Sequence, residues 1–155
     1  MQFESKDKMF GLRISKDLLQ TLEPELQRAG ENETGGILIG HYDEELHNAH
    51  LHTFSPPPAD SEAGPTWFRR GNKGLYRLLM KSWREGRYYL GEWHFHPKAA
   101  PTPSAQDLRQ MEKIAKDASY RCPEPVMVIV GGTATSFHLR AFVFAGEPVA
   151  CIELH

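Results

Sequence analysis

The chain has 155 residues, of which 40% are hydrophobic and 25% charged, with a formal net charge of −2 at pH 7. Its 18 Lys and Arg residues form no basic stripe, so we expect no nucleic-acid binding, and its longest apolar runs are too short to span a membrane. Residues 1–8 have mixed charge and no signal-peptide pattern, and two cysteines suit a reducing compartment. These features predict a cytoplasmic protein whose residues 1–155 form a single domain.

The first half of the chain predicts one divided helix, one hairpin and one long loop. Residues 15–29 have a helical leucine pattern, but Pro24 must kink or divide this helix. Residues 35–42 and 47–54 predict two strands joined by an acidic turn. Residues 55–72 contain four prolines and two glycines, so we expect an irregular loop, of the kind that often carries function.

The second half predicts two more helices among several strands. Residues 73–84 predict a helix that turns Trp83 inward with three leucines, and residues 104–116 predict another. Helices interspersed with strands and followed by hairpins indicate an α/β fold, with one mixed β-sheet flanked by helices. The strands expected here are residues 88–96, 126–130, 136–144 and 149–154.

The run from Glu92 to Asp107 has the spacing of a metal site. His94 and His96 are two residues apart on a predicted strand, so both imidazoles point to one face. Ser104 is a good N-cap for the helix that follows, and Asp107 lies in its first turn. Two histidines and a carboxylate that leave one position open are the usual ligands of a catalytic zinc ion, which lowers the pKa of a bound water.

Two simpler interpretations stay open at this stage. Ser104 and Asp107 also have the spacing of a capping box, although that box prefers Glu or Gln at its last position. A second pair, His50 and His52, has no carboxylate on a helix start within reach downstream, so we expect no metal there. We expect the other histidines to be surface or packing residues, with His138 facing outward: His41, His47, His138 and His155.

These motifs resemble the signature of the JAMM (JAB/MPN) metalloproteases. The resemblance rests on His94-Phe95-His96-Pro97, on Ser104 and Asp107, and on Glu33 before a glycine-punctuated apolar strand; the family usually has Ser or Thr where Phe95 stands. It implies a cytidine-deaminase-like fold and a Zn²⁺ ion held by His94, His96 and Asp107. It also implies that Glu33 is the catalytic base and that the Ser104 hydroxyl stabilises the oxyanion.

A second carboxylate competes for the role of base. Glu92 shares the face of His94, but strand geometry places it about 6 to 7 Å along the backbone, away from the Pro97 loop. We therefore follow the resemblance in assigning the base to Glu33, and expect Glu92 to support the site or to join an ion pair.

The resemblance implies a peptidase or isopeptidase that cleaves after the C-terminal tail of a ubiquitin-like modifier or of a conjugated protein. Residues 88–94 and the glycines at 131–132 resemble bacterial JAB proteins found beside ubiquitin-like activating and conjugating enzymes. This resemblance implies a role in a bacterial anti-phage CBASS system, in which the conjugated protein is a cyclic-nucleotide synthase. Trp67 and Phe68 suit either substrate contact or core packing. The alternatives are a non-catalytic MPN scaffold and a processing peptidase for a sulfur-carrier precursor.

Overall fold

The computed structural model describes residues 1–154, and His155, which we expected to be a surface or packing residue, lies outside them. Within that range the strands and helices alternate along most of the chain. In chain order they are β1 (Gln2–Ser5), β2 (Gly11–Arg13), α1 (Lys16–Gln20), α2 (Leu22–Ala29), β3 (Thr34–Tyr42), β4 (Asn48–Phe54), β5 (Glu62–Gly64), β6 (Trp67–Arg69), α3 (Leu75–Arg84), β7 (Tyr88–Pro97), α4 (Ala105–Lys116), the 3₁₀ helix η1 (Ala118–Tyr120), β8 (Val126–Thr133), β9 (Ser136–Ala145) and β10 (Glu147–Glu153).

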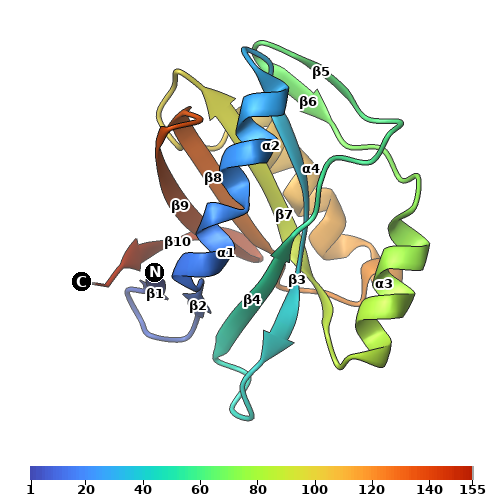
Figure 1. Cartoon of the computed structure of the whole chain (residues 1–155). Helices are drawn as coiled ribbons and strands as arrows, with labels where there is room; N and C mark the ends of the chain where they lie inside the picture. Colours follow the sequence, from blue (N-terminus) through green and yellow to red (C-terminus); the bar gives the residue numbers. More distant parts are fainter. Residues whose placement is uncertain (155) are drawn as a thin grey trace.

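Eight strands form a closed barrel in the order β1-β10-β9-β8-β7-β3-β4-β2 (Figure 1). The neighbouring pairs β7–β8 and β2–β4 are parallel and the other pairs are antiparallel. The architecture is therefore α/β with strands in mixed directions, but the sheet curves until its ends meet. Closure leaves no edge strand in the barrel, whereas β5 and β6 form a separate two-stranded sheet.

The two shortest barrel strands, β1 and β2, close the barrel and were not predicted. β1 pairs with β10, and β2 pairs with β4, which lie far away in the sequence. Strands of three or four residues have too little alternation to reveal themselves locally. The division of the first helix is confirmed, because α1 ends before Thr21 and α2 begins after it. Pro24 lies in the first turn of α2, where its missing N–H is not needed.

The buried side chains form two clusters on opposite faces of the central strands. The larger cluster contains Trp93 and Phe95 of β7 and packs against leucines of α1 and α2. The smaller one joins α4 to β8 and β9 through residues such as Met111 and Ile129. Figure 1 shows α2 in front of the central strands and α4 behind them. Because β7 lies between these layers, it can carry apolar side chains on one face and the histidines on the other.

The prediction that residues 55–72 have no regular structure is wrong. β5 and β6 form a hairpin with Glu62 opposite Arg69, and these two side chains form an ion pair at 2.5 Å. The three consecutive prolines precede the hairpin and the fourth lies in its turn, so none of them removes a ladder hydrogen bond. Phe68 is buried and therefore a packing residue, whereas Trp67 is 41% exposed and lies at the surface.

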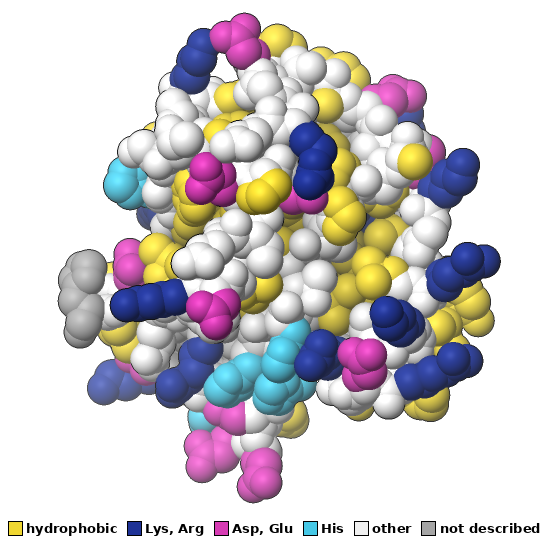
Figure 2. All heavy atoms as spheres, in the orientation of Figure 1, with side chains coloured by type: hydrophobic (Ala, Val, Ile, Leu, Met, Phe, Trp, Pro, Cys, Tyr) yellow, Lys and Arg dark blue, Asp and Glu magenta, His cyan; other side chains and the backbone are white. Residues whose placement is uncertain are grey.

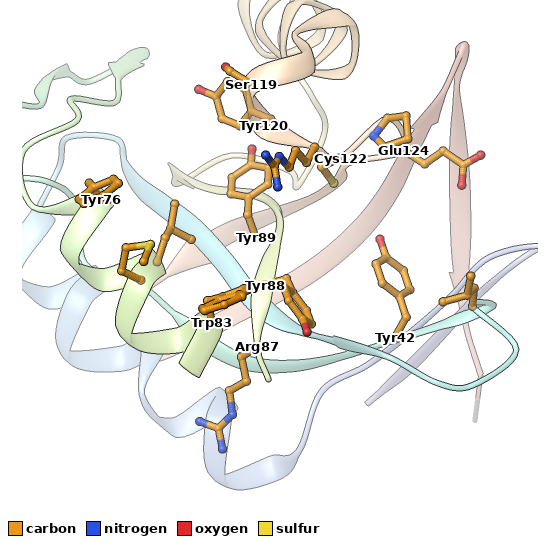
Figure 3. Close-up of a pocket in the computed structure, with 15 residues that line it drawn as sticks. Tyr42, Tyr76, Trp83, Arg87, Tyr88, Tyr89, Ser119, Tyr120, Cys122 and Glu124 are labelled. Carbon is orange, nitrogen blue, oxygen red and sulfur yellow. The ribbon is translucent and has the colours of Figure 1, made fainter. Parts of the chain in front are cut away.

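The prediction that Trp83 points inward is also wrong, because its ring is 61% exposed. The buried face of α3 passes through Ser82, one residue earlier, and so turns Trp83 toward solvent. Trp83 instead lines a groove of about 790 Å³ between α3 and the beginning of β7. Figure 3 shows Tyr42, Tyr88 and Tyr89 around the same hollow.

The remaining expectations concern surface residues, thiols and membrane spans. His138 is exposed, and His41 stacks on His50 and lies 2.8 Å from His52 across the β3–β4 hairpin. Figure 2 shows histidine side chains gathered near the end of this hairpin, next to acidic side chains. Both cysteines are free, buried thiols. Over residues 1–154 no helix is long and apolar enough to cross a membrane.

Candidate metal centre

The crossover from β7 through α4 to β8 brings the candidate ligands together. β7 and β8 are parallel neighbours, so the helix that joins them must begin near the carboxyl end of β7. His94 and His96 lie near that end of β7, and Asp107 lies in the first turn of α4. The connection from β7 to α4 therefore brings Asp107 next to His94 and His96, although it lies ten positions or more after them in the sequence.

The three side chains converge as their spacing predicts. Nδ1–H of His94 donates a hydrogen bond to Oδ1 of Asp107 at 2.7 Å, and Nε2 of His96 lies 3.1 Å from Oδ2. All three residues are buried. One ligand atom from each lies within 4.8 Å of the others, and no other set of three or more His, Cys, Asp or Glu residues within positions 1–154 comes this close.

Two ring nitrogens at this point have no hydrogen-bond partner. They are Nε2 of His94 and Nε2 of His96, and both are buried. A buried polar atom without a partner costs about 1–3 kcal/mol, so native proteins rarely retain one without a reason. A cation bound by the imidazoles and the neighbouring carboxylate would satisfy both atoms. The residues present therefore fit a divalent metal with nitrogen and oxygen ligands, of which zinc is the usual example.

Glu33 reaches the cluster through the register of two neighbouring strands. In the antiparallel β3–β7 pair, Thr34 lies opposite Phe95 and Gly35 opposite His94. One further step along this register places Glu33 beside His96, and their Oε1 and Nε2 atoms are 3.9 Å apart. Glu33 is 8% exposed, although acids are mostly surface residues. The sequence contains no local signal of this register, so only the fold brings Glu33 to the site.

Ser104 and Asp107 form a full capping box at the start of α4. The Ser104 hydroxyl accepts a hydrogen bond from the Asp107 N–H at 3.1 Å, and Oδ2 of Asp107 accepts one from the Ser104 N–H at 2.7 Å. The cap uses only a lone pair of the hydroxyl, because the backbone N–H is the donor. The hydroxyl hydrogen of Ser104 therefore stays available, and capping does not exclude a second role.

Two neighbours of His94 were not predicted to belong to the site. The ring of Phe68 meets the His94 ring edge to face, with centroids 5.2 Å apart. On the same side, a Cβ at Gly35 would lie 2.7 Å from Cδ2 of His94 and 2.2 Å from the Trp93 carbonyl oxygen. Only glycine leaves room for the imidazole at this position. The sequence shows a glycine at position 35. Its place opposite His94 depends on the pairing of β3 with β7, so its importance cannot be seen before the sheet is known.

Glu92 joins an ion pair, one of the two roles that we expected for it. Its Oε2 accepts a hydrogen bond from Nε of Arg70 at 2.7 Å, and the side chains are 0% and 3% exposed, respectively. Arg70 was not singled out in the sequence. An arginine in a polar loop gave no sign that it would be buried.

The surroundings of the cluster shift the pKa values of its two neighbouring acids, Asp107 and Glu33, in opposite directions. Burial raises the pKa of Asp107, but the hydrogen bond to His94 and the adjacent His96 ring outweigh burial and hold it well below its usual range. Burial lowers the pKa of His96, and the neighbouring Asp107 carboxylate outweighs this and raises it. For Glu33 burial dominates and raises the pKa, with partial compensation from His96. Asp107 is thus held as a carboxylate that can bind a cation, whereas Glu33 has a higher affinity for a proton than an exposed glutamate has.

Comparisons with known proteins agree with this geometry. A protein of Enterobacter hormaechei subsp. hoffmannii, named "CD-NTase/cGAS isopeptidase", is 46% identical over 142 residues, which cover 91% of this chain and 79% of that protein. A Pseudomonas aeruginosa protein of the same name is 28% identical over 142 residues, covering 85% of this chain and 86% of that one.

A structural comparison supports the fold. The solution structure of a Desulfitobacterium hafniense protein superposes with a TM-score of 0.69 at 20% identity, over 93% of this chain and 91% of that one.

The family model described as prokaryotic homologs of the JAB domain matches residues 15–144. That range contains β3, β7 and α4, the three elements that form the cluster. The chain belongs to the prokaryotic JAB family.

Proposed function

We propose that this protein is a zinc-dependent isopeptidase in which His94, His96 and Asp107 hold the metal. The observation that carries the proposal is the pair of buried imidazole nitrogens without partners beside a buried carboxylate. Asp107 lies within hydrogen-bonding distance of both rings, so the fold gathers the three candidate ligands at one point. Zinc bound here would polarise the scissile carbonyl and lower the pKa of a water molecule.

Glu33 would act as the general base and then as the general acid. Its carboxylate would take a proton from the attacking water and deliver it to the leaving amine. Burial raises the pKa of Glu33, which makes its carboxylate a stronger base toward the attacking water than an exposed glutamate would be. Its position beside His96, 3.9 Å from Nε2, supports this role over Glu92, which is held by Arg70.

Ser104 would stabilise the oxyanion of the tetrahedral intermediate through its hydroxyl hydrogen. The hydroxyl oxygen stays in the helix cap, which fixes the direction of the donor. The first turn of α4 adds the positive end of the helix dipole, which favours negative charge on both the ligand carboxylate and the oxyanion.

The substrate in this proposal is a protein conjugated through the C-terminal tail of a cyclic-nucleotide synthase, as the names of the two relatives suggest. The partners would then be that synthase and a ubiquitin-activating or conjugating-like enzyme, in an anti-phage CBASS system. An extended tail needs a strand edge to pair with. The barrel is closed, but the β5–β6 hairpin has free edges, and the carbonyl oxygen of Gly64 in this hairpin accepts a hydrogen bond from the N–H of Glu33 at 2.9 Å.

Three coarser assignments complete the proposal. We assign the chain to one domain over residues 1–155 with the cytidine-deaminase-like fold, because the family model matches residues 15–144 and the strands outside that range pair into the same barrel. We place the protein in the cytoplasm, where its two free thiols would persist.

The experiment compares metal content and cleavage in matched histidine variants. The protein is purified without chelators, and zinc is measured by elemental analysis. The substrate is a reporter protein joined to the C-terminal tail of a cyclic-nucleotide synthase. We expect one zinc per chain and cleavage for the wild type, and loss of both for His94→Ala. His138→Ala is the control, since this exposed histidine lies on β9. A wild-type protein that binds no zinc and cleaves nothing would support a scaffold instead.

A further inference from the structure

Within residues 1–154, the ion pair between Arg70 and Glu92 is the most deeply buried pair of charges outside the ligand cluster. Removing two charges from water is costly, and a pair repays that cost only when its geometry is good and its other polar atoms are bonded. Both conditions hold here. Glu92 also lies two residues before His94 on the same face of β7, so the pair is next to the metal-binding strand.

Each polar atom of this pair bonds to a different part of the chain. Nη1 of Arg70 donates to the Gly71 carbonyl oxygen and to Oδ1 of Asn72, both at 2.9 Å. Nη2 donates to the Tyr120 hydroxyl at 2.9 Å. The Tyr89 hydroxyl donates to Oε1 of Glu92 at 2.7 Å. One guanidinium group therefore joins the end of the hairpin, strand β7 and the η1 turn that follows α4.

A β-bulge makes this arrangement possible. Tyr89 and Glu92 are three residues apart, so in a regular strand they would face opposite sides. The register with β3 shifts at Leu90, which turns Tyr89 to the side of Glu92. Gly91 allows the close approach to β8, because a Cβ there would lie 1.7 Å from the Val126 carbonyl oxygen. Figure 3 shows Tyr89 next to Tyr120, and their ring centroids are 5.1 Å apart.

The hairpin that Arg70 anchors contacts His94 of the cluster and the neighbouring Glu33. Phe68, two residues before Arg70, packs its ring against His94. Gly64, at the end of β5, accepts the hydrogen bond from the Glu33 N–H. A hairpin of two three-residue strands is too small to hold its own position, so its place depends on such anchors.

We propose that Arg70 is a positioning residue: by bridging Glu92, Tyr120 and the backbone after β6, it holds the β5–β6 hairpin against His94 and Glu33. The expected effect of Arg70 on zinc binding rests on the proposed metal site. Its expected effect on the hairpin does not. A merely structural ion pair would change stability without changing the hairpin or the ligands selectively.

The test uses zinc alone as the probe and amide hydrogen exchange of the metal-free protein. Arg70→Met removes the charge and the fork, and Arg70→Lys keeps the charge without the fork. Arg70→Met with Glu92→Met removes both charges, which avoids leaving a buried carboxylate unpaired. Arg69→Met is the matched control, because Arg69 is the exposed neighbour that pairs with Glu62.

We expect the double variant to melt near the wild-type temperature, yet to bind zinc at least about tenfold more weakly in competition with a chromophoric chelator. Amides of the hairpin and of Glu33 should exchange at least about tenfold faster, while those of β8 and β9 stay protected. Arg70→Lys should show the same pattern, and Arg69→Met should behave as the wild type.

The inference would be overturned if the double variant kept the zinc affinity and the hairpin protection of the wild type. Wild-type behaviour of Arg70→Lys in both measurements would overturn it as well. Failure of the wild-type protein to bind zinc would instead count against the proposed function, and the exchange data would still decide the role of Arg70.

Discussion

Replacing Glu33 by glutamine tests the assignment of the base most directly. The change keeps the size of the side chain and removes its ability to accept and return a proton. Loss of a general base lowers turnover by about 10²- to 10⁴-fold, which corresponds to about 3 to 5 kcal/mol in the activation free energy. Zinc content should be unchanged, because Glu33 lies 3.9 Å from His96 Nε2 and is outside the ligand set.

The same substitution has a predicted effect on stability, with a sign set by the raised pKa of Glu33. Folding favours the protonated carboxyl, so the ionised carboxylate destabilises the metal-free protein once the pH exceeds the ordinary value of 4.5. Metal-free Glu33→Gln should therefore be more stable than the wild type at pH 7, and this difference should vanish below pH 4.5. Urea unfolding at the two pH values measures the effect.

The assay for turnover is cleavage of the reporter fusion under single-turnover conditions. Glu31→Gln is the control, because Glu31 is a nearby exposed acid that pairs with Lys98. It should retain full turnover and show no gain in stability of this kind. Retained cleavage by Glu33→Gln, with Glu92→Gln inactive instead, would show that Glu92 is the base and that Glu33 is not.

Three other changes test the geometry of the site and the core. Gly35→Ala should weaken zinc binding by at least about tenfold, because the new Cβ would lie 2.7 Å from Cδ2 of His94, and chelator competition would show wild-type affinity if the ring can move freely. Zinc affinity should fall as the pH drops below the raised pKa of His96, because only the neutral imidazole binds a metal. The expected decrease is about tenfold per pH unit for each proton that zinc displaces, and a zinc affinity that does not change with pH would contradict this. Trp93→Phe should lower the free energy of unfolding by about 1–3 kcal/mol in urea, because the Ser55 carbonyl oxygen loses its 2.9 Å bond from the indole N–H; an unchanged midpoint would mean that water replaces the donor.

The difference between what was predicted and what was missed follows the range of the interactions. The orientation of His94 and His96 depends only on the two-residue period of a strand, and the place of Asp107 on the cap of the helix that follows. Trp83 was misplaced because a helical leucine pattern does not show how wide the buried face is. The hairpin at β5 and β6 was missed because proline content says nothing about the short segments before and after Pro65.

Local patterns in the chain were enough to predict the α/β class, the main strands and helices, and the spacing of the three candidate ligands, because each is set by periodicity and capping within about a dozen residues. The tertiary structure alone decided that Glu33 lies beside His96, that Arg70 is buried against Glu92, and that short terminal strands close the barrel. These features depend on strand register and on contacts between segments far apart in the chain. Such contacts are selected by the packing of the whole core, so no local pattern of residues contains them.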